Sequence, residues 1–383
     1  MKIAYCIPSC HQSGGMERVL SLKANYLTDV LGWEVTVITT EKETSKPVFP
    51  LSPKVKKQNL DINYRDEEQY SLLSRVFIRL KKKKLHHQRL GDFLFKEKYD
   101  ICVSMFCHEM SFLASIKDGS KKVLELHFCK NFRRLDIQYN KKGILRYILG
   151  LFQDWKERSY IRRYGAFVVL THEDARDWGS NYRCKVIPNP LSFQSPTPIP
   201  NRALRAIAVG RLCPQKGFDL LIRAWELLPY DLKLQWSLAI YGDGPEKDDL
   251  IKLISDHTAD ERISIYAPVK DIQKELESSS IFCFSSRYEG FSMALLEAMG
   301  CGLPCLSFDC PCGPKDIITQ NINGVLVDSF SIERFASALE RLMRDEQLRL
   351  SIGREAARNV RENFSMDKVM GQWSELFKDL IKS

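Results

Sequence analysis

Two glutamates, Glu289 and Glu297, lie eight residues apart in the segment of this sequence with the most candidates for chemistry. The pattern around them predicts a strand ending at Ser285, a loop with Gly290, and a helix beginning near Ser292. The N–H groups that open a helix carry partial positive charge, so they can bind phosphate or sugar hydroxyl oxygens. Glu289 would lie beside this site, in a cleft at the carboxyl end of the strand. The alternative is that Glu289 caps the helix and Glu297 is a surface residue.

A second candidate site lies in the loop between Gly210 and Gly217, which contains the two cations Arg211 and Lys216. This loop follows the first predicted strand of the second half of the chain and precedes a helix. An arginine can bind phosphate oxygens in pairs and a lysine acts as a point charge, so together they could neutralise a diphosphate. On residue type alone, two solvated surface cations remain the alternative.

Two further glycine loops are predicted to join a strand to a helix. One contains Gly242 and Gly244, and the other contains Gly14 and Gly15, where a ligand could approach the backbone closely. Neither loop has the third glycine of the dinucleotide-binding fingerprint G-x-G-x-x-G, which argues against a nicotinamide or flavin cofactor.

The elements that would position these loops follow an alternating strand and helix pattern, which is typical of parallel sheets covered on both faces. In the first half we expect strands at residues 2–8, 34–39, 100–104, 121–126 and 166–170. In the second half we expect strands at residues 206–209, 238–241, 263–266, 281–285, 305–308 and 325–327. The tail, residues 332–381, has a helical pattern.

The expected fold class is therefore α/β, with two doubly wound Rossmann-like domains facing a central cleft and a helical C-terminal tail. The N-terminal domain is placed at residues 1–190 and the C-terminal domain at residues 205–383, separated by a proline-rich linker at 191–204. The last helix could pack back on the N-terminal domain.

Composition restricts the class of protein. Of 383 residues, 44% are apolar and 27% charged, as in ordinary globular proteins. No run approaches the ~20 uncharged apolar residues that span a bilayer, and the N-terminus does not resemble a secretion signal. The twelve cysteines are scattered without a CxxC pair, which favours reduced thiols in a cytoplasmic protein.

The net charge of +9 is concentrated in the first half of the chain. Residues 1–200 carry 34 Lys and Arg against 21 Asp and Glu, or +13, and the remaining 23 and 27 give −4. Segments 71–90 and 143–163 interleave these cations with large apolar residues. Basic amphipathic helices of this kind dock on anionic membrane surfaces, although a solvated helix face remains the alternative.

Together these motifs resemble the family 4 retaining glycosyltransferases, which have the GT-B fold of two Rossmann domains. The resemblance extends over nearly the whole chain, and residues 309–318 also resemble a segment of the polysaccharide-building members. It is carried in order by Gly14-Gly15-Met16-Glu17-Arg18, Ile187-Pro188-Asn189-Pro190, Gly210-Arg211 with Gln215-Lys216-Gly217, Gly242-Asp243-Gly244-Pro245-Glu246, and the block from Glu289 to Glu297.

The resemblance implies a nucleotide-sugar donor in the second domain and an acceptor in the first. Arg211 and Lys216 would neutralise the departing diphosphate, a form of electrostatic stabilisation that is often the largest catalytic contribution. Glu289 would hold hydroxyls of the donor sugar near the reacting carbon, and Glu297 would accept hydrogen bonds from the ribose. Backbone groups of the helix start would meet the sugar and phosphates, namely those of Gly290, Phe291, Ser292 and Met293.

Two histidines of the first domain are added by the resemblance. His127, at the end of the strand 121–126, matches a position where family members often have a histidine that reaches the donor sugar. His108 could also line the cleft. Gly14, Gly15 and Gly242 are expected to contact substrate. The family commonly has a glycine near the base after the strand 263–266, where this chain departs from the pattern with Ala267-Pro268-Val269, so this loop does not identify the base. The resemblance to the family implies uridine diphosphate first and guanosine diphosphate second.

The function that the resemblance implies is the transfer of a hexose or N-acetylhexosamine from a UDP-linked donor, with retention and without a metal or cofactor. The acceptor would be a saccharide, a polyprenyl-diphosphate-linked sugar or a glycolipid, in the synthesis of capsule, lipopolysaccharide or glycolipid. The enzyme would be cytoplasmic and peripheral on the inner face of the membrane, docked through residues 71–90 and 143–163. The alternatives are a GT-B nucleotide-sugar epimerase and a nucleic-acid-binding protein; the basic first half suggests the latter, but no nucleic-acid module is recognisable.

Overall fold

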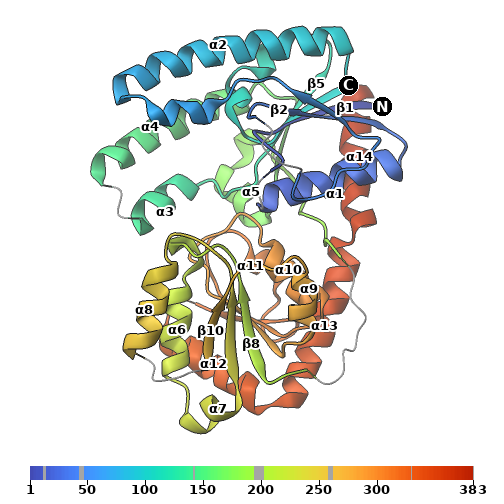
Figure 1. Ribbon diagram of the computed structural model, residues 1–383. Helices are drawn as coiled ribbons and strands as arrows, with labels where there is room; N and C mark the ends of the chain where they lie inside the picture. Colours follow the sequence, from blue (N-terminus) through green and yellow to red (C-terminus); the bar gives the residue numbers. More distant parts are fainter. Residues whose placement is uncertain are drawn as a thin grey trace.

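Two parallel β-sheets, each with helices on both faces, make up the structure (Figure 1). The computed structural model describes residues 1–11, 14–42, 47–140, 143–193, 202–257, 262–328 and 330–382. The sheet orders are β3-β2-β1-β4-β5-β6-β7 and β10-β9-β8-β11-β12-β13. We call the unit built on the first sheet the first domain and the unit built on the second sheet the second domain.

The first sheet contains the five strands expected there and two more. The additional strands lie at its two edges: β3 has the polar sequence KKQN, and β7 has only two residues. Neither has the apolar alternation from which a strand is predicted. The strands are β1 Lys2–Cys6, β2 Glu34–Thr39, β3 Lys56–Asn59, β4 Ile101–Ser104, β5 Lys121–Glu125, β6 Ala166–Val169 and β7 Lys185–Val186.

The helices of the first domain include the two basic segments as continuous helices, α2 and α4. The α-helices are α1 Gly15–Asp29, α2 Leu72–Glu97, α3 Phe132–Tyr139, α4 Ile144–Ile161 and α5 His172–Trp178. The 3₁₀ helices are η1 Tyr64–Gln69, η2 His108–Ser111, η3 Leu113–Ser115 and η4 Ser180–Tyr182.

The second sheet contains all six expected strands, and its central strands are buried on both faces. They are β8 Arg205–Val209, β9 Ser237–Tyr241, β10 Ile263–Tyr266, β11 Ile281–Phe284, β12 Cys305–Phe308 and β13 Val325–Val327. The helices are η5 Pro214–Lys216, α6 Phe218–Glu226, α7 Tyr230–Gln235, α8 Lys247–His257, α9 Ile272–Glu277, α10 Met293–Gly300, α11 Pro314–Ile317, α12 Ile332–Arg344 and α13 Glu346–Phe364.

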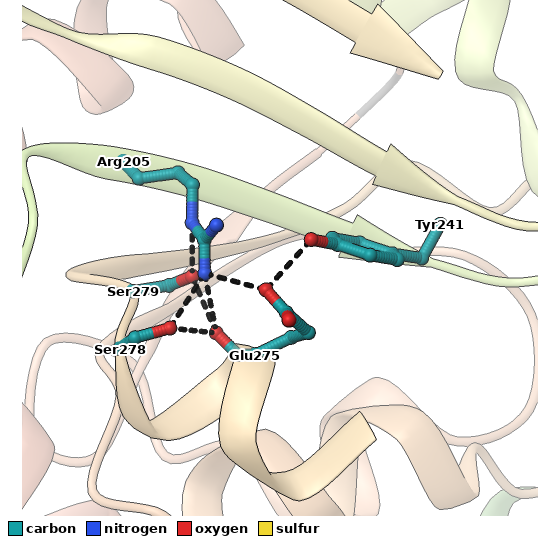
Figure 2. A network of polar contacts seen from close by, with 5 residues as sticks. All are labelled: Arg205, Tyr241, Glu275, Ser278 and Ser279. Carbon is teal, nitrogen blue, oxygen red and sulfur yellow. Dashed lines mark hydrogen bonds and ion pairs between the residues drawn. The ribbon is translucent and has the colours of Figure 1, made fainter. Parts of the chain in front are cut away.

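Helix α9 is tied to two strands of this sheet by a polar network around Glu275 (Figure 2). Arg205 Nη2 and the Tyr241 hydroxyl both donate to Glu275 Oε2, at 3.0 and 2.6 Å. Arg205 also donates to the hydroxyls of Ser278 and Ser279. The network therefore fixes β8 and β9, the strands whose ends carry the Gly210 and Gly242 loops.

The last helix, α14 Met366–Lys382, returns to the first domain (Figure 1). Its buried residues Trp373 and Phe377 share a hydrophobic cluster with Ile3 and Tyr5 of β1. The tail is thus helical, as its sequence predicts, and its final helix covers the core of the other domain. Within the described ranges, no helix combines the length and apolar character that crossing a membrane requires.

The predicted linker at 191–204 lies largely in residues 194–201, which are outside the described part of the chain. Its first residues pack on the second domain, since the Leu191 N–H donates to the Phe364 carbonyl at 2.7 Å. The domain limits at 190 and 205 remain a prediction. The expected fold class, with two doubly wound domains and a helical tail, is confirmed.

Candidate active site

The carboxyl ends of the two sheets face each other, and their loops touch. A Cβ built on Gly290, after β11, would lie 2.2 Å from the carbonyl oxygen of His127, after β5. A Cβ on Gly15 would lie 4.0 Å from Met293 Cγ at the start of α10. The glycine loop of the first domain therefore faces the helix start of the second, as expected for loops that enclose one cleft.

Lys216 and Glu289 form an ion pair between the loops that follow β8 and β11. Lys216 Nζ lies 2.6 Å from Glu289 Oε1, which also accepts a hydrogen bond from the Ser286 hydroxyl at 2.6 Å. The loops meet because Gly217 has φ +61° and its α-carbon faces the Ser285 carbonyl, where a Cβ would come within 2.3 Å. Only glycine fits that position.

Arg211 lies in the same loop as Lys216, with its side chain exposed. The methylenes of Lys216 cross Gly210, the residue before Arg211, at 3.3 Å from the position of a Cβ. The structure thus brings Lys216 and Glu289 into contact, and Arg211 is exposed in the same loop.

Glu297 is buried and paired, so the alternative that it is a surface residue is wrong. Its Oε1 lies 2.7 Å from Arg18 Nη1 of α1, and the Ser192 hydroxyl donates to the same oxygen at 2.7 Å. Burial raises the pKa of Glu297, and the charge of Arg18 and the Ser192 hydrogen bond act against that rise. The ion pair joins the two domains at the second turn of α10.

The start of α10 is capped by Ser292, whose hydroxyl accepts a hydrogen bond from the Leu295 N–H at 3.3 Å. The alternative that Glu289 caps this helix is therefore wrong. Phe291 is buried against Phe364, at 5.7 Å between ring centroids. The first N–H groups of any helix have no intrahelical acceptor, so this end retains donors for an anion or a sugar.

His127 turns its ring toward the first domain. Its side chain is 5% exposed and its Nε2 lies 3.1 Å from Oε1 of Glu125, the last residue of β5. Its carbonyl, as noted above, faces Gly290. The expected contact of His127 with a donor sugar stays a prediction.

His108 is held within the first domain. Its ring stacks on Tyr64 of η1, with 3.9 Å between centroids and 21° between planes. Burial lowers the pKa of His108, and so does the charge of Arg79. The structure therefore associates His108 with α2 and η1, and its expected place in the cleft stays a prediction.

Three other predicted substrate contacts have clear local settings. A Cβ on Gly242 would lie 1.9 Å from the Gly210 carbonyl, so this glycine lets the loops after β8 and β9 pack together. A Cβ on Gly14 would lie 2.3 Å from Glu17 Oε2. Val269 is exposed in the loop after β10. Their roles in substrate binding stay predictions.

Residues 192–359 match the sequence model of the family described as "Glycosyl transferases group 1". The matched residues contain Arg211, Lys216, Glu289 and Glu297, whereas His127 lies outside them.

Two relatives illustrate how far the similarity extends. The amylovoran biosynthesis glycosyltransferase AmsD of Erwinia amylovora is 36% identical over 172 residues, which is 45% of this chain and 47% of AmsD. That alignment therefore spans only about half of each protein. An uncharacterized glycosyltransferase of Haemophilus influenzae is 27% identical over 380 residues, 97% of this chain and 98% of that protein.

A solved structure with a similar fold is that of a mutant of S. aureus TarM in complex with Fondaparinux, alpha-GlcNAc-glycerol and UDP. The TM-score is 0.76 at 16% identity, over 98% of this chain and 100% of that one. The architecture of the chain is therefore the GT-B fold.

Sequence reasoning missed four residues that the structure connects to the predicted site. Arg18 belongs to the motif that begins with Gly14-Gly15, so its place in the sequence pointed to a functional role. Its pairing with Glu297 was not evident from the sequence. Ser192 gave no signal. Glu125 and Lys23 form a buried ion pair behind His127, with Lys23 Nζ at 2.7 and 2.6 Å from the two carboxylate oxygens.

Proposed function

We propose that this protein transfers a hexose or N-acetylhexosamine from a UDP-linked donor to a saccharide or lipid-linked acceptor, with retention of configuration. The Lys216–Glu289 ion pair, beside the helix start that faces Gly15, is the observation that carries the proposal. The match of residues 192–359 to the group 1 glycosyltransferase model favours this reaction over the epimerase and nucleic-acid-binding alternatives. The UDP in the TarM complex and the role of AmsD in amylovoran biosynthesis support the donor and the polysaccharide product.

The ion pair suggests how the donor would be received. When a nucleoside diphosphate enters, Lys216 can exchange the Glu289 carboxylate for a phosphate oxygen, which leaves Glu289 free to accept hydrogen bonds from sugar hydroxyls. Arg211 can bind the same diphosphate from the exposed side of the loop. These cations would stabilise the negative charge that develops as the diphosphate departs. With departure and attack on the same face, neither a protein nucleophile nor a metal ion is needed.

We further propose that the acceptor is reached at the inner face of a membrane, on which the protein is peripheral. Helices α2 and α4 lie side by side, since Lys83 Nζ lies 6.0 Å from the ring centroid of Tyr160. Both expose large apolar side chains among cations; on α4 these include Ile144, Ile148, Leu149, Phe152 and Trp155. Such a surface suits anionic lipid, where each nearby cation contributes ~1 kcal/mol.

The transfer reaction is tested by replacing the paired residues. Lys216→Ala and Glu289→Gln should each lower kcat for sugar transfer by about 10²–10³-fold, the effect of losing one group that stabilises transition-state charge. Unfolding temperatures would verify that both variants fold. Lys274→Ala, which removes an exposed ion pair with Asp271 on α9, is the matched control and should leave kcat unchanged.

Near-wild-type transfer in either variant would remove that residue from the mechanism. A thermal-shift series with UDP, GDP and their sugars would identify the base, and UDP should stabilise the protein most. Activity should survive EDTA, and complete loss that a divalent ion restores would contradict the metal-free reaction.

A further inference from the structure

The loop that follows β12, residues 309–313, lies against Glu289. The Glu289 N–H donates to the Pro311 carbonyl at 3.1 Å, and a Cβ built on Gly313 would lie 3.7 Å from the Cβ of Glu289. This loop belongs to the segment that resembles the polysaccharide-building glycosyltransferases. It therefore supports the backbone of the residue that pairs with Lys216.

Helix α11, at the end of this loop, meets helix α5 of the first domain where the two domains face each other (Figure 1). Glu173 Oε2 of α5 accepts a hydrogen bond from the Cys312 N–H of the loop at 2.9 Å. In return, the Asp316 carboxylate of α11 accepts from the N–H groups of His172 and Glu173 at 2.8 and 3.3 Å. Each domain thus supplies a carboxylate to backbone donors of the other, and hydrogen bonds to a charged acceptor are among the stronger ones.

Helix α5 uses this contact to complete its first turn. The first N–H groups of a helix have no acceptor within the helix itself. Thr171 accepts from the Asp174 N–H at 3.1 Å, and Asp316 accepts from the two N–H groups that precede it. The start of α5 is therefore capped jointly by a residue of its own domain and a residue of the other.

On the side of the loop, the contact holds a backbone conformation that residues with a side chain rarely adopt. Cys312 has φ +59°, in the left-handed region. A residue keeps such a conformation only where its surroundings enforce it. The Cys312 N–H is bound by Glu173, and its side chain packs with Cys129 of the first domain and Tyr288 of the second. Opening of the domains would remove Glu173 and Cys129 together, which would free the loop to move away from Glu289.

We propose that Glu173 and Asp316 are positioning residues that hold the loop after β12 against Glu289, so that the donor-sugar site is complete only when the domains are closed. The inference rests on the proposed sugar transfer for the role of Glu289. Neither carboxylate contacts the sugar, and both act through the loop. Closure of the domains is in this way coupled to the arrangement of the donor site.

The first test measures hydrogen exchange in the full chain and requires no activity. In Glu173→Ala, the backbone amide of Glu289 should exchange at least about threefold faster than in the wild type, because its acceptor Pro311 is no longer held in place. Mass spectrometry of the peptide that contains Glu289 measures this rate, and the unfolding temperature verifies that the variant folds. An unchanged rate at Glu289 would overturn the proposal, since residue 173 would then not act across the interface.

The matched control replaces a helix cap that lies within one domain. Asp345 accepts from the Leu348 N–H at 2.9 Å at the start of α13, so Asp345→Ala removes the same kind of contact as Asp316→Ala. Asp316→Ala should speed exchange at the start of α5 and at Glu289, whereas Asp345→Ala should speed it at α13 alone. Equal acceleration at Glu289 in both variants would show a general loss of stability and contradict the proposal.

The second test separates catalysis from donor binding. Glu173→Ala and Asp316→Ala should each lower kcat about tenfold or more, because misplacement of the reacting groups slows the reaction strongly. The Kd for UDP should change less than about twofold, because Arg211 and Lys216 stay intact. Glu173→Gln keeps an acceptor oxygen for the Cys312 N–H and should recover most of the activity.

A parallel fall in UDP affinity, or an unchanged kcat in both alanine variants, would contradict the positioning role. If the wild type transfers no sugar, the proposed function fails, while hydrogen exchange at Glu289 still decides whether the contact between α5 and the loop positions that residue.

Discussion

At the residue scale, Glu109 has one of the most strongly shifted acidities of the first domain. Its carboxylate is buried beside β4 and accepts a hydrogen bond from the Ser104 hydroxyl at 2.6 Å. Burial raises its pKa to about 7, although the Ser104 hydrogen bond and backbone N–H groups act in the opposite direction. The folded protein therefore holds the proton of Glu109 far more tightly than the unfolded chain does.

This shift predicts a measurable dependence of stability on pH. Because the folded pKa lies above the unfolded value of 4.5, Glu109 favours folding fully below about pH 4.5 and loses that contribution as pH rises to about 7. Glu109→Gln removes this dependence on pH, because glutamine does not titrate. The wild type should lose about 2 kcal/mol of unfolding free energy between pH 5 and pH 8 relative to the variant. Urea unfolding at the two pH values measures it. The exposed substitution Glu355→Gln should leave the wild-type dependence intact, and equal behaviour of the two variants would contradict the assignment.

The meeting of Lys216 with Glu289 could be anticipated from sequence, because both follow strands of one parallel sheet whose carboxyl ends share an edge. The pairing of Glu297 could not. Its partners Arg18 and Ser192 come from α1 and from a segment 105 residues away, and the contact exists only once the domains have closed. Residue type and local spacing carry no information about such a contact.

At the element scale, buried strands and amphipathic helices were predictable, and edge strands were not. All six strands of the second sheet were expected because each has a run of apolar residues. Strand β3 was missed because KKQN at the sheet edge needs no apolar face, and its pairing with β2 through backbone hydrogen bonds leaves no pattern in the side chains. Helices α2 and α4 were expected from their periodicity. The sequence did not show which of their apolar residues would be exposed.

The exposed face of α4 leads to a prediction about membranes. The rings of Phe152 and Trp155 stack with 5.9 Å between their centroids, and the two residues are 53% and 66% exposed. Adjacent aromatic side chains exposed to water in this way are typical of an interaction surface. The double variant Phe152→Glu with Trp155→Glu should bind vesicles rich in phosphatidylglycerol at least about tenfold more weakly than the wild type. The change removes the apolar area that the membrane would bury, and it adds negative charges that the anionic lipid repels. Co-sedimentation at low salt measures the bound fraction.

The matched control for that experiment lies on α7 of the second domain. Tyr230 and Leu234 are 73% and 52% exposed, so Tyr230→Glu with Leu234→Glu makes the same chemical change at an equally exposed place. This variant should bind vesicles like the wild type. Equal loss in both variants would indicate nonspecific adhesion, and a wild type that ignores anionic vesicles would end the docking proposal.

At the scale of the whole molecule, the structure is a closed arrangement held by contacts between chain segments far apart in sequence. Arg18 pairs with Glu297, and Tyr139 stacks on Tyr288 at 5.9 Å between ring centroids; both contacts join the two domains. Release of a product from between two domains requires such contacts to open.

A close approach of the two domains at Gly290 predicts the effect of a single methyl group. A Cβ at position 290 would lie 2.2 Å from the His127 carbonyl oxygen and 2.9 Å from Phe128 Cα, both backbone atoms that cannot rotate away. Gly290 does not have a positive φ, so alanine strains only the contact between domains. Gly290→Ala should therefore leave the unfolding temperature nearly unchanged and shift small-angle scattering toward a larger radius of gyration. It should also lower the transfer rate about tenfold or more, because a small displacement of the reacting groups slows the reaction strongly. Gly371→Ala on α14, where a Cβ meets nothing within 4 Å, should change none of the three. If Gly290→Ala scatters and reacts like the wild type, the closed form is not the one in which transfer occurs.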